Sequence, residues 1–185
     1  MPAQPQHKMT VDEYLAWAED RPGRYELYAG VVYAMAPERA RHAEVKFTVQ
    51  AALLAAIRRA GLRCHMLPDG MTVRVSEHTA HEPNAFVYCG EKLPDSALEV
   101  PNPLILVEVL SPSTRHIDAS AKLAGYFSLD SVHHYLIVDP EAPPVIHHAR
   151  GENGVIATRI AREGSLRFDP PGLELAIAEL YPAKE

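Results

Sequence analysis

The sequence has few cysteines, and those it has are isolated. Cys64 and Cys89 are the two cysteines among 185 residues, and they do not form a CxxC pair. Isolated cysteines are typical of core thiols in a reducing cytoplasm. We therefore expect neither a disulfide framework nor a thiol nucleophile, and a cytoplasmic protein.

Long apolar runs are also missing. No run approaches the roughly 20 residues that a membrane span needs. The N-terminus, MPAQPQHKMT, lacks the apolar core of a signal peptide. There is no internal repeat and no low-complexity block. We expect no contact with a membrane, a disordered tail over residues 1–8, and a single domain over residues 9–185.

Positive charge is in deficit. Lysine and arginine number 18 against 24 acidic residues, and the net charge is −6. A nucleic-acid-binding protein normally carries a basic footprint, so charge alone does not support that partner. A local group of arginines is present at Arg39, Arg41, Arg58, Arg59 and Arg63. Such a group is more often the solvated face of a helix.

Several catalytic and metal-binding motifs are absent. The ten histidines include no HExxH or Cys/His spacing typical of zinc sites. The pairs His133-His134 and His147-His148 lie on or beside expected strands, where neighbouring side chains point to opposite faces and cannot chelate one ion together. No P-loop, GxGxxG or nucleophile elbow occurs, so nucleotide binding and serine hydrolysis have no support.

The most informative stretch runs from residue 102 to residue 140. Leu104 to Leu110 is an apolar run interrupted by Glu108, and it predicts a buried strand. A carboxylate inside such a strand costs several kcal/mol, roughly, unless it is paired or holds a metal. The alternative is a carboxylate that points to solvent or meets an arginine at the strand end.

A helix and a second strand follow. Asp118 can cap a helix from about Ala119 to Leu129, and residues 134–138 predict another buried strand. Short links between strand, helix and strand imply a right-handed crossover and parallel pairing. Lys122 lies in the first turns of the helix. A strand-end carboxylate with a lysine nearby is a candidate site for metal-assisted chemistry.

The remaining elements predict an α/β domain with a mixed sheet. Residues 10–13 form a capping box before a short helix, and residues 25–28 and 31–35 form a hairpin that carries Glu26. Glu26 taken alone is an ordinary exposed strand position. A long helix over residues 38–60, with His42 and Glu44 in its early turns, ends at Gly61. Further strands are expected at residues 63–67, 71–75 and 85–88, and residues 145–148 and 155–160 form a second hairpin. Residues 173–175 and 177–181 close the domain.

After these exclusions, the remaining candidate is chemistry at a metal ion that is bound by oxygen ligands. Glu108, Asn84 and Glu26 offer oxygen atoms, and Lys122 offers a positive charge. Mg²⁺ prefers carboxylates, an occasional carbonyl and several waters. Phosphodiester hydrolysis uses such an ion to orient water and neutralise developing charge, with a lysine able to assist.

Four phrases of the sequence carry a family resemblance. RYELYAGVVYAM, EPNAFVYCG, PLILVEVLSPSTRHIDASAKLAGYF and VHHYLIVDP resemble the Uma-two family of putative restriction endonucleases, within the PD-(D/E)XK nuclease superfamily. The resemblance covers about residues 9–150. VEVLSPST followed by D-x-x-x-K-x-x-x-Y is its most specific part. It implies a restriction-endonuclease-like fold, with a mixed central sheet flanked by helices.

The resemblance also implies site residues. Glu108 matches the carboxylate of the second half-motif, and Lys122 matches a lysine that the family carries on the following helix. Glu26 matches the acidic residue of the first motif loosely, and His42 matches a polar position. The aspartate of the "PD" half falls on Asn84, a departure that keeps a carbonyl oxygen but loses a charge. Glu82 or Glu77 could substitute for it, although no spacing shows this.

The resemblance therefore implies a nuclease that hydrolyses nucleic-acid phosphodiesters with Mg²⁺ or Mn²⁺. Glu108 and Asn84 would hold the ion, Lys122 would orient or activate water, and Glu26 would complete the site. Because Asn84 lacks a charge, we expect weak metal binding. DNA is favoured over RNA as a partner, and the sequence leaves open whether the protein forms a homodimer. The alternatives are an inactive nuclease-fold module for binding or dimerisation and a hydrolase of another phosphate ester.

Overall fold

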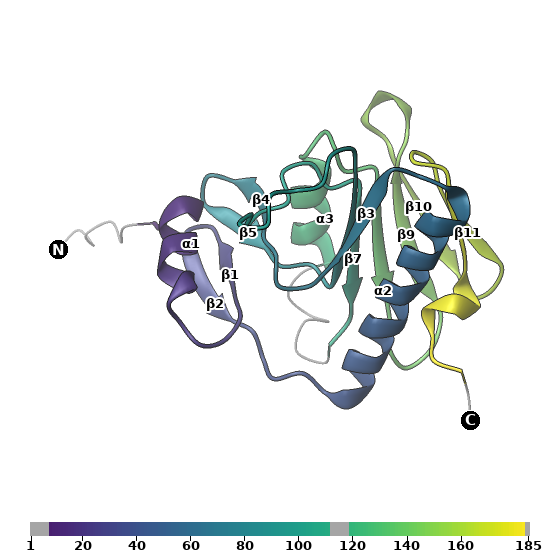
Figure 1. Ribbon diagram of the computed structural model, residues 1–185, viewed down its shortest axis with the longest axis horizontal. Coiled ribbons are helices and arrows are strands. Elements are labelled where there is room, and N and C mark those ends of the chain that lie inside the picture. Colours follow the sequence, from purple (N-terminus) through teal and green to yellow (C-terminus); the bar gives the residue numbers. More distant parts are fainter. Residues whose placement is uncertain (1–7, 112–118, 184–185) are drawn as a thin grey trace.

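The computed structural model describes residues 8–111 and 119–183, and it has an α/β fold (Figure 1). The helices are α1 (Val11–Glu19), α2 (Ala40–Ala60) and α3 (Ala119–Phe127), with short 3-10 helices η1 (Glu152–Gly154) and η2 (Ile177–Leu180). None of the helices within the described ranges is both long enough and apolar enough to cross a membrane.

Strands in the described residues form three sheets. The central sheet has six strands in the order β10-β9-β8-β7-β6-β3. Their bounds are β3 (Cys64–Pro68), β6 (Ala85–Cys89), β7 (Ile105–Val109), β8 (His134–Val138), β9 (Val145–Arg150) and β10 (Ile156–Ala161). A four-stranded sheet, β2-β1-β5-β4, consists of β1 (Tyr25–Tyr28), β2 (Val31–Ala34), β4 (Val73–Ser76) and β5 (Thr79–His81). β11 (Ser165–Phe168) and β12 (Leu173–Ala176) pair with each other.

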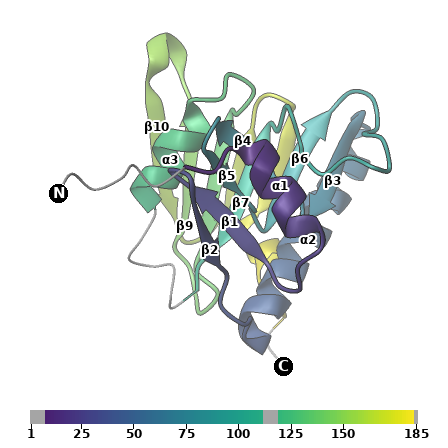
Figure 2. The same ribbon diagram turned by 90° about the vertical axis from the view of Figure 1, so that its left-hand side faces the viewer.

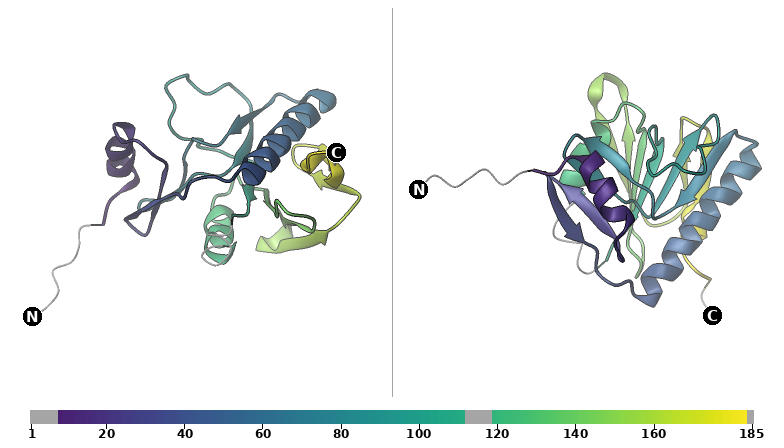
Figure 3. Two further views of the ribbon diagram at one scale, coloured as in Figure 1. Left: turned by 90° about the horizontal axis from the view of Figure 1, so that it is seen from below. Right: turned by 60° about the vertical axis from the view of Figure 1, so that its left-hand side comes forward.

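The two larger hydrophobic clusters lie on opposite faces of the central sheet. Leu53 of α2 packs with Val107 and Leu136 on one face. Tyr126 of α3 packs with Leu106 on the other, because neighbouring strand residues point to opposite sides. Seen from below, α2 and α3 accordingly flank the sheet (Figure 3). This is the mixed sheet flanked by helices that the sequence predicts.

The small sheet is covered by the first helix. α1 lies over the β1–β2 hairpin (Figure 2), where Val11 and Tyr14 pack against Leu27. The predicted capping box is present, with Thr10 accepting from the backbone N–H of Glu13 and the Glu13 carboxylate accepting from that of Thr10. One face of the hairpin is therefore covered by α1.

The strand–helix–strand unit is confirmed. β7 and β8 pair in parallel, with Glu108 opposite Ile137, and α3 connects them. The long helix begins at Ala40 rather than residue 38, and it ends at Gly61 in a left-handed conformation with φ of 61°. The predicted cap, Asp118, lies outside the described residues.

Two strands were not predicted, and further boundaries differ from the prediction, with α3 ending at Phe127 rather than Leu129. β5 is three residues long and β11 four, so the pattern of buried and exposed side chains in each is too short to stand out in the sequence. The strand expected from Met71 begins at Val73. The segment from Ile177 is a 3-10 helix whose residues Ile177 and Leu180 are buried.

The expectation of free thiols is wrong. Cys64 and Cys89 lie directly opposite each other where β3 and β6 pair, with Cα atoms 3.9 Å apart, and a disulfide joins them. Cross-strand pairing brings them together although 25 residues separate them in the sequence. Their isolation therefore gives no support for a reducing compartment, and the cytoplasmic location stays a prediction.

Candidate functional site

Two carboxylates meet one buried lysine at the end of β7. Lys122 Nζ donates to Glu108 Oε1 at 2.9 Å and to Glu26 Oε1 at 2.8 Å. The lysine side chain is only 10% exposed, and those of Glu108 and Glu26 are 14% and 17% exposed. β7, α3 and β1 each supply one of these side chains. We call these three residues the lysine-bridged cluster.

The charge states of the cluster follow from its geometry. Burial works against the charged form of Lys122, but Glu108 and Glu26 outweigh it and raise the pKa of the lysine. Burial likewise tends to raise the pKa of Glu26, but the neighbouring His81 ring and the charge of Lys122 lower that pKa to about 2. Lys122 is thus an ammonium and Glu26 a carboxylate at neutral pH. A protonated lysine orients and stabilises negative charge, and it does not accept a proton.

Two aromatic groups border the cluster. The Tyr126 hydroxyl donates to Glu108 Oε1 at 2.9 Å. Burial first, and then the charge of Glu108, raise the pKa of Tyr126 well above its ordinary value, so it stays a donor. The His81 ring is almost fully buried and lies 3.6 Å from Glu26 Oε2. Neither residue was predicted as a site residue. Tyr126 could have been found because it follows Lys122 by four residues, one turn along the same helix face.

A second charged network lies beside the first. Arg24 contacts Glu82 and also Asp69, the latter at 2.6 Å, and Lys46 contacts Asp69 at 2.9 Å. The Glu82 backbone N–H donates to Glu26 Oε1 at 3.0 Å, so the two networks are joined. Burial raises the pKa of the Glu82 carboxyl, while Arg24 acts in the opposite direction. The Glu82 carboxylate therefore pairs with Arg24 and does not contact Lys122.

The long helix adds a histidine to this second network. His42 contacts Glu38 through Nδ1 and the Val109 carbonyl through Nε2, at 2.8 Å. Because a carbonyl oxygen can only accept, Nε2 carries the hydrogen. His42 thereby ties the start of α2 to the end of β7, one residue beyond Glu108.

Asn84 lies immediately before β6, next to the end of β7. Its Oδ1 accepts from the Val109 backbone N–H at 2.7 Å, and its own backbone N–H donates to the Val107 carbonyl at 2.9 Å. Gln50 of α2 donates to the Asn84 carbonyl at 2.8 Å. Asn84 is almost fully buried. An amide oxygen has two lone pairs, so one acceptor position of Oδ1 remains after the bond to Val109.

The structure brings together most of the predicted site residues. Glu26, Glu108 and Lys122 are in direct contact, and Asn84 and His42 both bond to Val109, the next residue after Glu108. Glu77 does not join them, because it pairs with His78 at 3.7 Å and is largely exposed. Glu26 is not an ordinary exposed strand residue, since Lys122 and the Glu82 backbone both bond to it.

The donor set fits a hard cation in part. Two carboxylates already converge on one positive charge, the ammonium of Lys122, and carboxylate oxygens are the ligands that Mg²⁺ prefers. Within the described ranges, however, no three Asp, Glu, His or Cys side chains form a group that could hold a metal ion. An ion held by both Glu26 and Glu108 would share their oxygens with the ammonium.

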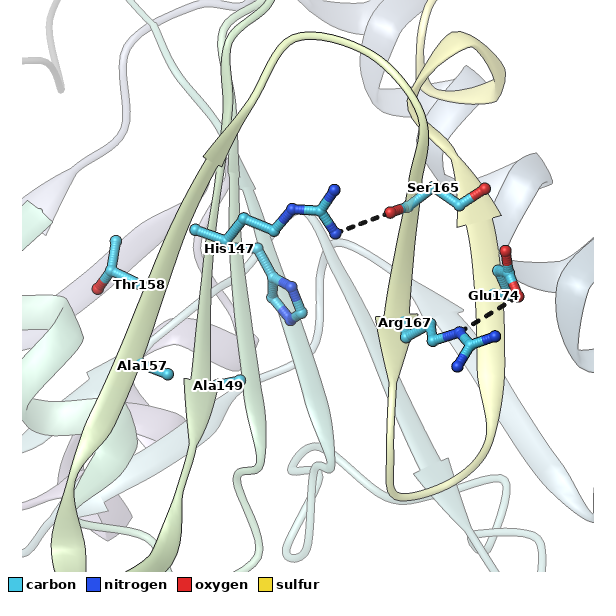
Figure 4. Close-up of a pocket in the computed structure, with 8 residues that line it drawn as sticks. His147, Ala149, Ala157, Thr158, Ser165, Arg167 and Glu174 are labelled. Atoms are coloured by element: carbon cyan, nitrogen blue, oxygen red, sulfur yellow. Dashed lines mark hydrogen bonds and ion pairs between the residues drawn. The ribbon is translucent and has the colours of Figure 1, made fainter.

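A cavity of about 370 Å³ lies away from this cluster. It is formed between β9–β10 and the β11–β12 pair (Figure 4). The His147 ring points into it, Arg159 donates to the Ser165 carbonyl at 2.9 Å, and Arg167 faces Glu174. Its residues come from the C-terminal third of the chain, and no predicted site residue lines it.

The arginines do not form a single basic patch. Arg39 and Arg41 lie at the start of α2, whereas Arg58 and Arg59 lie in its last turn. A rise of 1.5 Å per residue separates these pairs by roughly 25 Å. Arg59 is also paired with Glu179 at 2.9 Å. These arginines therefore provide no concentrated positive surface beside the cluster.

Comparisons with known proteins define the class of this fold. It is similar to the crystal structure of a putative nuclease belonging to DUF820 from Anabaena variabilis, with a TM-score of 0.71 over 93% of this chain and 97% of that one. The sequences are 12% identical, so this likeness concerns the fold. The family model Uma2, described as "Putative restriction endonuclease", matches residues 11–178, and the chain belongs to that family. An uncharacterized protein of Synechocystis is 24% identical, over 97% of this chain and 95% of its own length.

Proposed function

We propose that this protein is a divalent-metal-dependent nuclease that hydrolyses phosphodiester bonds of DNA. The lysine-bridged cluster is the observation that carries the proposal. Two buried carboxylates and an ammonium from separate elements meet at the end of a central parallel strand, where α/β folds place their sites. Membership of a family described as restriction endonucleases supports DNA as the substrate.

The charge of each residue determines its role in the proposed reaction. Glu108 and Glu26 would hold Mg²⁺ or Mn²⁺, with the free lone pair of Asn84 Oδ1 as a neutral ligand. The bound ion would supply Lewis-acid stabilisation of phosphoryl charge and a water of lowered pKa. Lys122 uses two N–H donors on Glu26 and Glu108, so a third remains to contact a phosphate oxygen. Tyr126 holds Glu108 in place by donating to Oε1.

A second candidate function is supported by Asn84. Its oxygen already binds a backbone N–H, and it lacks the charge that a metal site gains from an aspartate. A nuclease fold with this replacement could act as a binding or dimerisation module without catalysis. Measured metal affinity and cleavage separate the two candidates.

The test is cleavage of plasmid and of labelled single-stranded DNA in Mg²⁺, in Mn²⁺ and in EDTA. We expect metal-dependent cleavage that is lost in Glu108→Ala. Glu174→Ala is the matched control, because Glu174 is a strand carboxylate of β12 whose side chain is 55% exposed and which faces Arg167 instead. Absence of cleavage in both metals, together with no heat of Mn²⁺ binding in calorimetry, would favour the non-catalytic module.

A further inference from the structure

The β1–β2 hairpin has two different faces. Leu27 and its cross-strand partner Val32 lie on the face that packs against α1. Because side chains alternate along a strand, Glu26 and its partner Tyr33 lie on the opposite face. That second face is the one from which Glu26 reaches Lys122.

Large apolar and aromatic side chains on this second face are exposed. Tyr28 is 43% exposed, Val31 51% and Tyr33 53%. Tyr28 pairs with Val31, and Tyr33 pairs with Glu26. We call Tyr28, Val31 and Tyr33 the tyrosine strip. Directly opposed residues have Cβ atoms about 5 Å apart, so the strip adjoins the lysine-bridged cluster.

The two tyrosine rings differ in what holds them. Tyr28 stacks on His81, with ring centroids 6.3 Å apart and planes inclined by 26°. His81 in turn contacts Glu26, so this ring is fixed relative to the cluster. Within the described ranges the Tyr33 side chain has neither a hydrogen bond nor a ring partner, and it is 53% exposed. An exposed aromatic ring beside the lysine-bridged cluster is available to stack on a planar ligand.

The charges around the cluster argue against binding dominated by the phosphate backbone. Five carboxylates, those of Glu26, Glu38, Asp69, Glu82 and Glu108, are linked with three permanent cations, Arg24, Lys46 and Lys122. Neutralising the backbone of a duplex takes many lysines or arginines. Stacking of bases on aromatic rings does not need positive charge, and it is open only to unpaired bases.

We propose that the tyrosine strip is a stacking platform for an unpaired base of single-stranded DNA, held beside the lysine-bridged cluster. This inference rests on the proposed nuclease function and adds its substrate class. Tyr33 supplies the open ring, and Tyr28, backed by His81, supplies a fixed one. Single-stranded DNA is bound in preference to an intact duplex, whose bases cannot reach the strip.

The experiment measures binding separately from cleavage. Fluorescence anisotropy of a labelled single-stranded 12-mer is recorded in Ca²⁺ and in EDTA, beside the same sequence as a duplex and as RNA. Tyr33→Ala should weaken binding of single-stranded DNA about tenfold, while Tyr33→Phe should retain it, since stacking needs the ring. Phe47→Ala is the matched control, because Phe47 is 71% exposed but lies on the solvent side of α2.

Each outcome decides the proposal. A wild-type protein that binds no single-stranded DNA in either condition overturns it, and so does a folded Tyr33→Ala variant with unchanged affinity. Binding of the duplex or of RNA as tight as that of single-stranded DNA would overturn the assigned substrate class. If binding depends on Tyr33 but no metal supports cleavage, the strip stands and the nuclease function fails. If Glu108 is needed for cleavage but Tyr33 is not needed for binding, the nuclease function is supported and the stacking platform is ruled out.

Discussion

His134 and His147 form a buried pair, with His134 Nδ1 and His147 Nε2 only 3.0 Å apart. His134 Nε2 contacts the Pro170 carbonyl at 2.9 Å, and a carbonyl only accepts. A neutral His134 therefore carries its hydrogen on Nε2, and its bare Nδ1 accepts from His147. Two protonated rings at this distance would repel each other.

This pair predicts acid sensitivity. Burial is the main cause that lowers the pKa of each ring from 6.5 to about 4, and for His147 the neighbouring His134 adds to it. The unfolded chain then binds more protons between pH 6.5 and pH 4, so the free energy of unfolding falls as pH drops through that range. The loss should reach up to about 3 kcal/mol for each ring.

Urea unfolding from pH 4.5 to pH 7.5 checks this dependence. We expect His147→Gln to flatten it, because one of the two titrating rings is removed. His78→Gln serves as control, since His78 is partly exposed. Equal slopes in the wild type and in His147→Gln would contradict the assignment.

Lys122 should be more important for stability than either of its partners. Lys122→Met leaves Glu26 and Glu108 facing each other without a cation, and removing one member of a buried ion pair costs about 3–5 kcal/mol. Glu108→Gln should cost less, because Glu26 still binds the ammonium. Urea unfolding in EDTA measures the free energy of unfolding of both variants.

Metal should partly restore the Lys122→Met variant. Without the ammonium, the two carboxylates are open to a divalent ion, and binding to the folded state alone raises the free energy of unfolding. We expect a larger rise in melting temperature with Mn²⁺ for Lys122→Met than for the wild type. Lys92→Met, which removes an exposed lysine paired with Asp95, should show no such difference. An equal Mn²⁺ effect in all three proteins would rule out a metal site between these carboxylates.

Reduction of the disulfide should lower stability without removing the fold. Cross-linking Cys64 and Cys89 closes a loop with a sequence separation of 25, which is worth about 3.5 kcal/mol in the chain-entropy account. Melting curves with and without reductant measure the effect, and a Cys64→Ser, Cys89→Ser double variant should not respond to reductant. Two titratable thiols in unreduced, denatured protein would show that the bridge does not form.

Asn84→Asp should tighten metal binding. The aspartate can keep the hydrogen bond from Val109 and adds one negative charge near Glu108. A net gain of about 1.4 kcal/mol is tenfold in affinity. Calorimetry with Mg²⁺ or Mn²⁺ measures it, cleavage should rise in parallel, and Asn102→Asp adds the same charge at an exposed position as control. Unchanged affinity in Asn84→Asp would show that this position is not a metal ligand.

Local sequence features were sufficient for much of the secondary structure. The capping box at Thr10, the helix end at Gly61 and the β1–β2 hairpin are predicted from neighbouring residues, and the structure has all three. The parallel pairing of β7 and β8 followed from short links around one helix. Glu108 was recognisable because a lone carboxylate in an apolar strand needs a partner.

The partners themselves were decided by the tertiary structure. Glu26 reaches Lys122 across 96 residues, Cys64 meets Cys89 through strand register, and His134 meets His147 where β8 and β9 pair. Periodicity shows which face of an element is buried, but not which other element covers it. The sequence by itself therefore determined the elements and the residues that need partners, whereas the packing of separate sheets and helices decided which side chains meet.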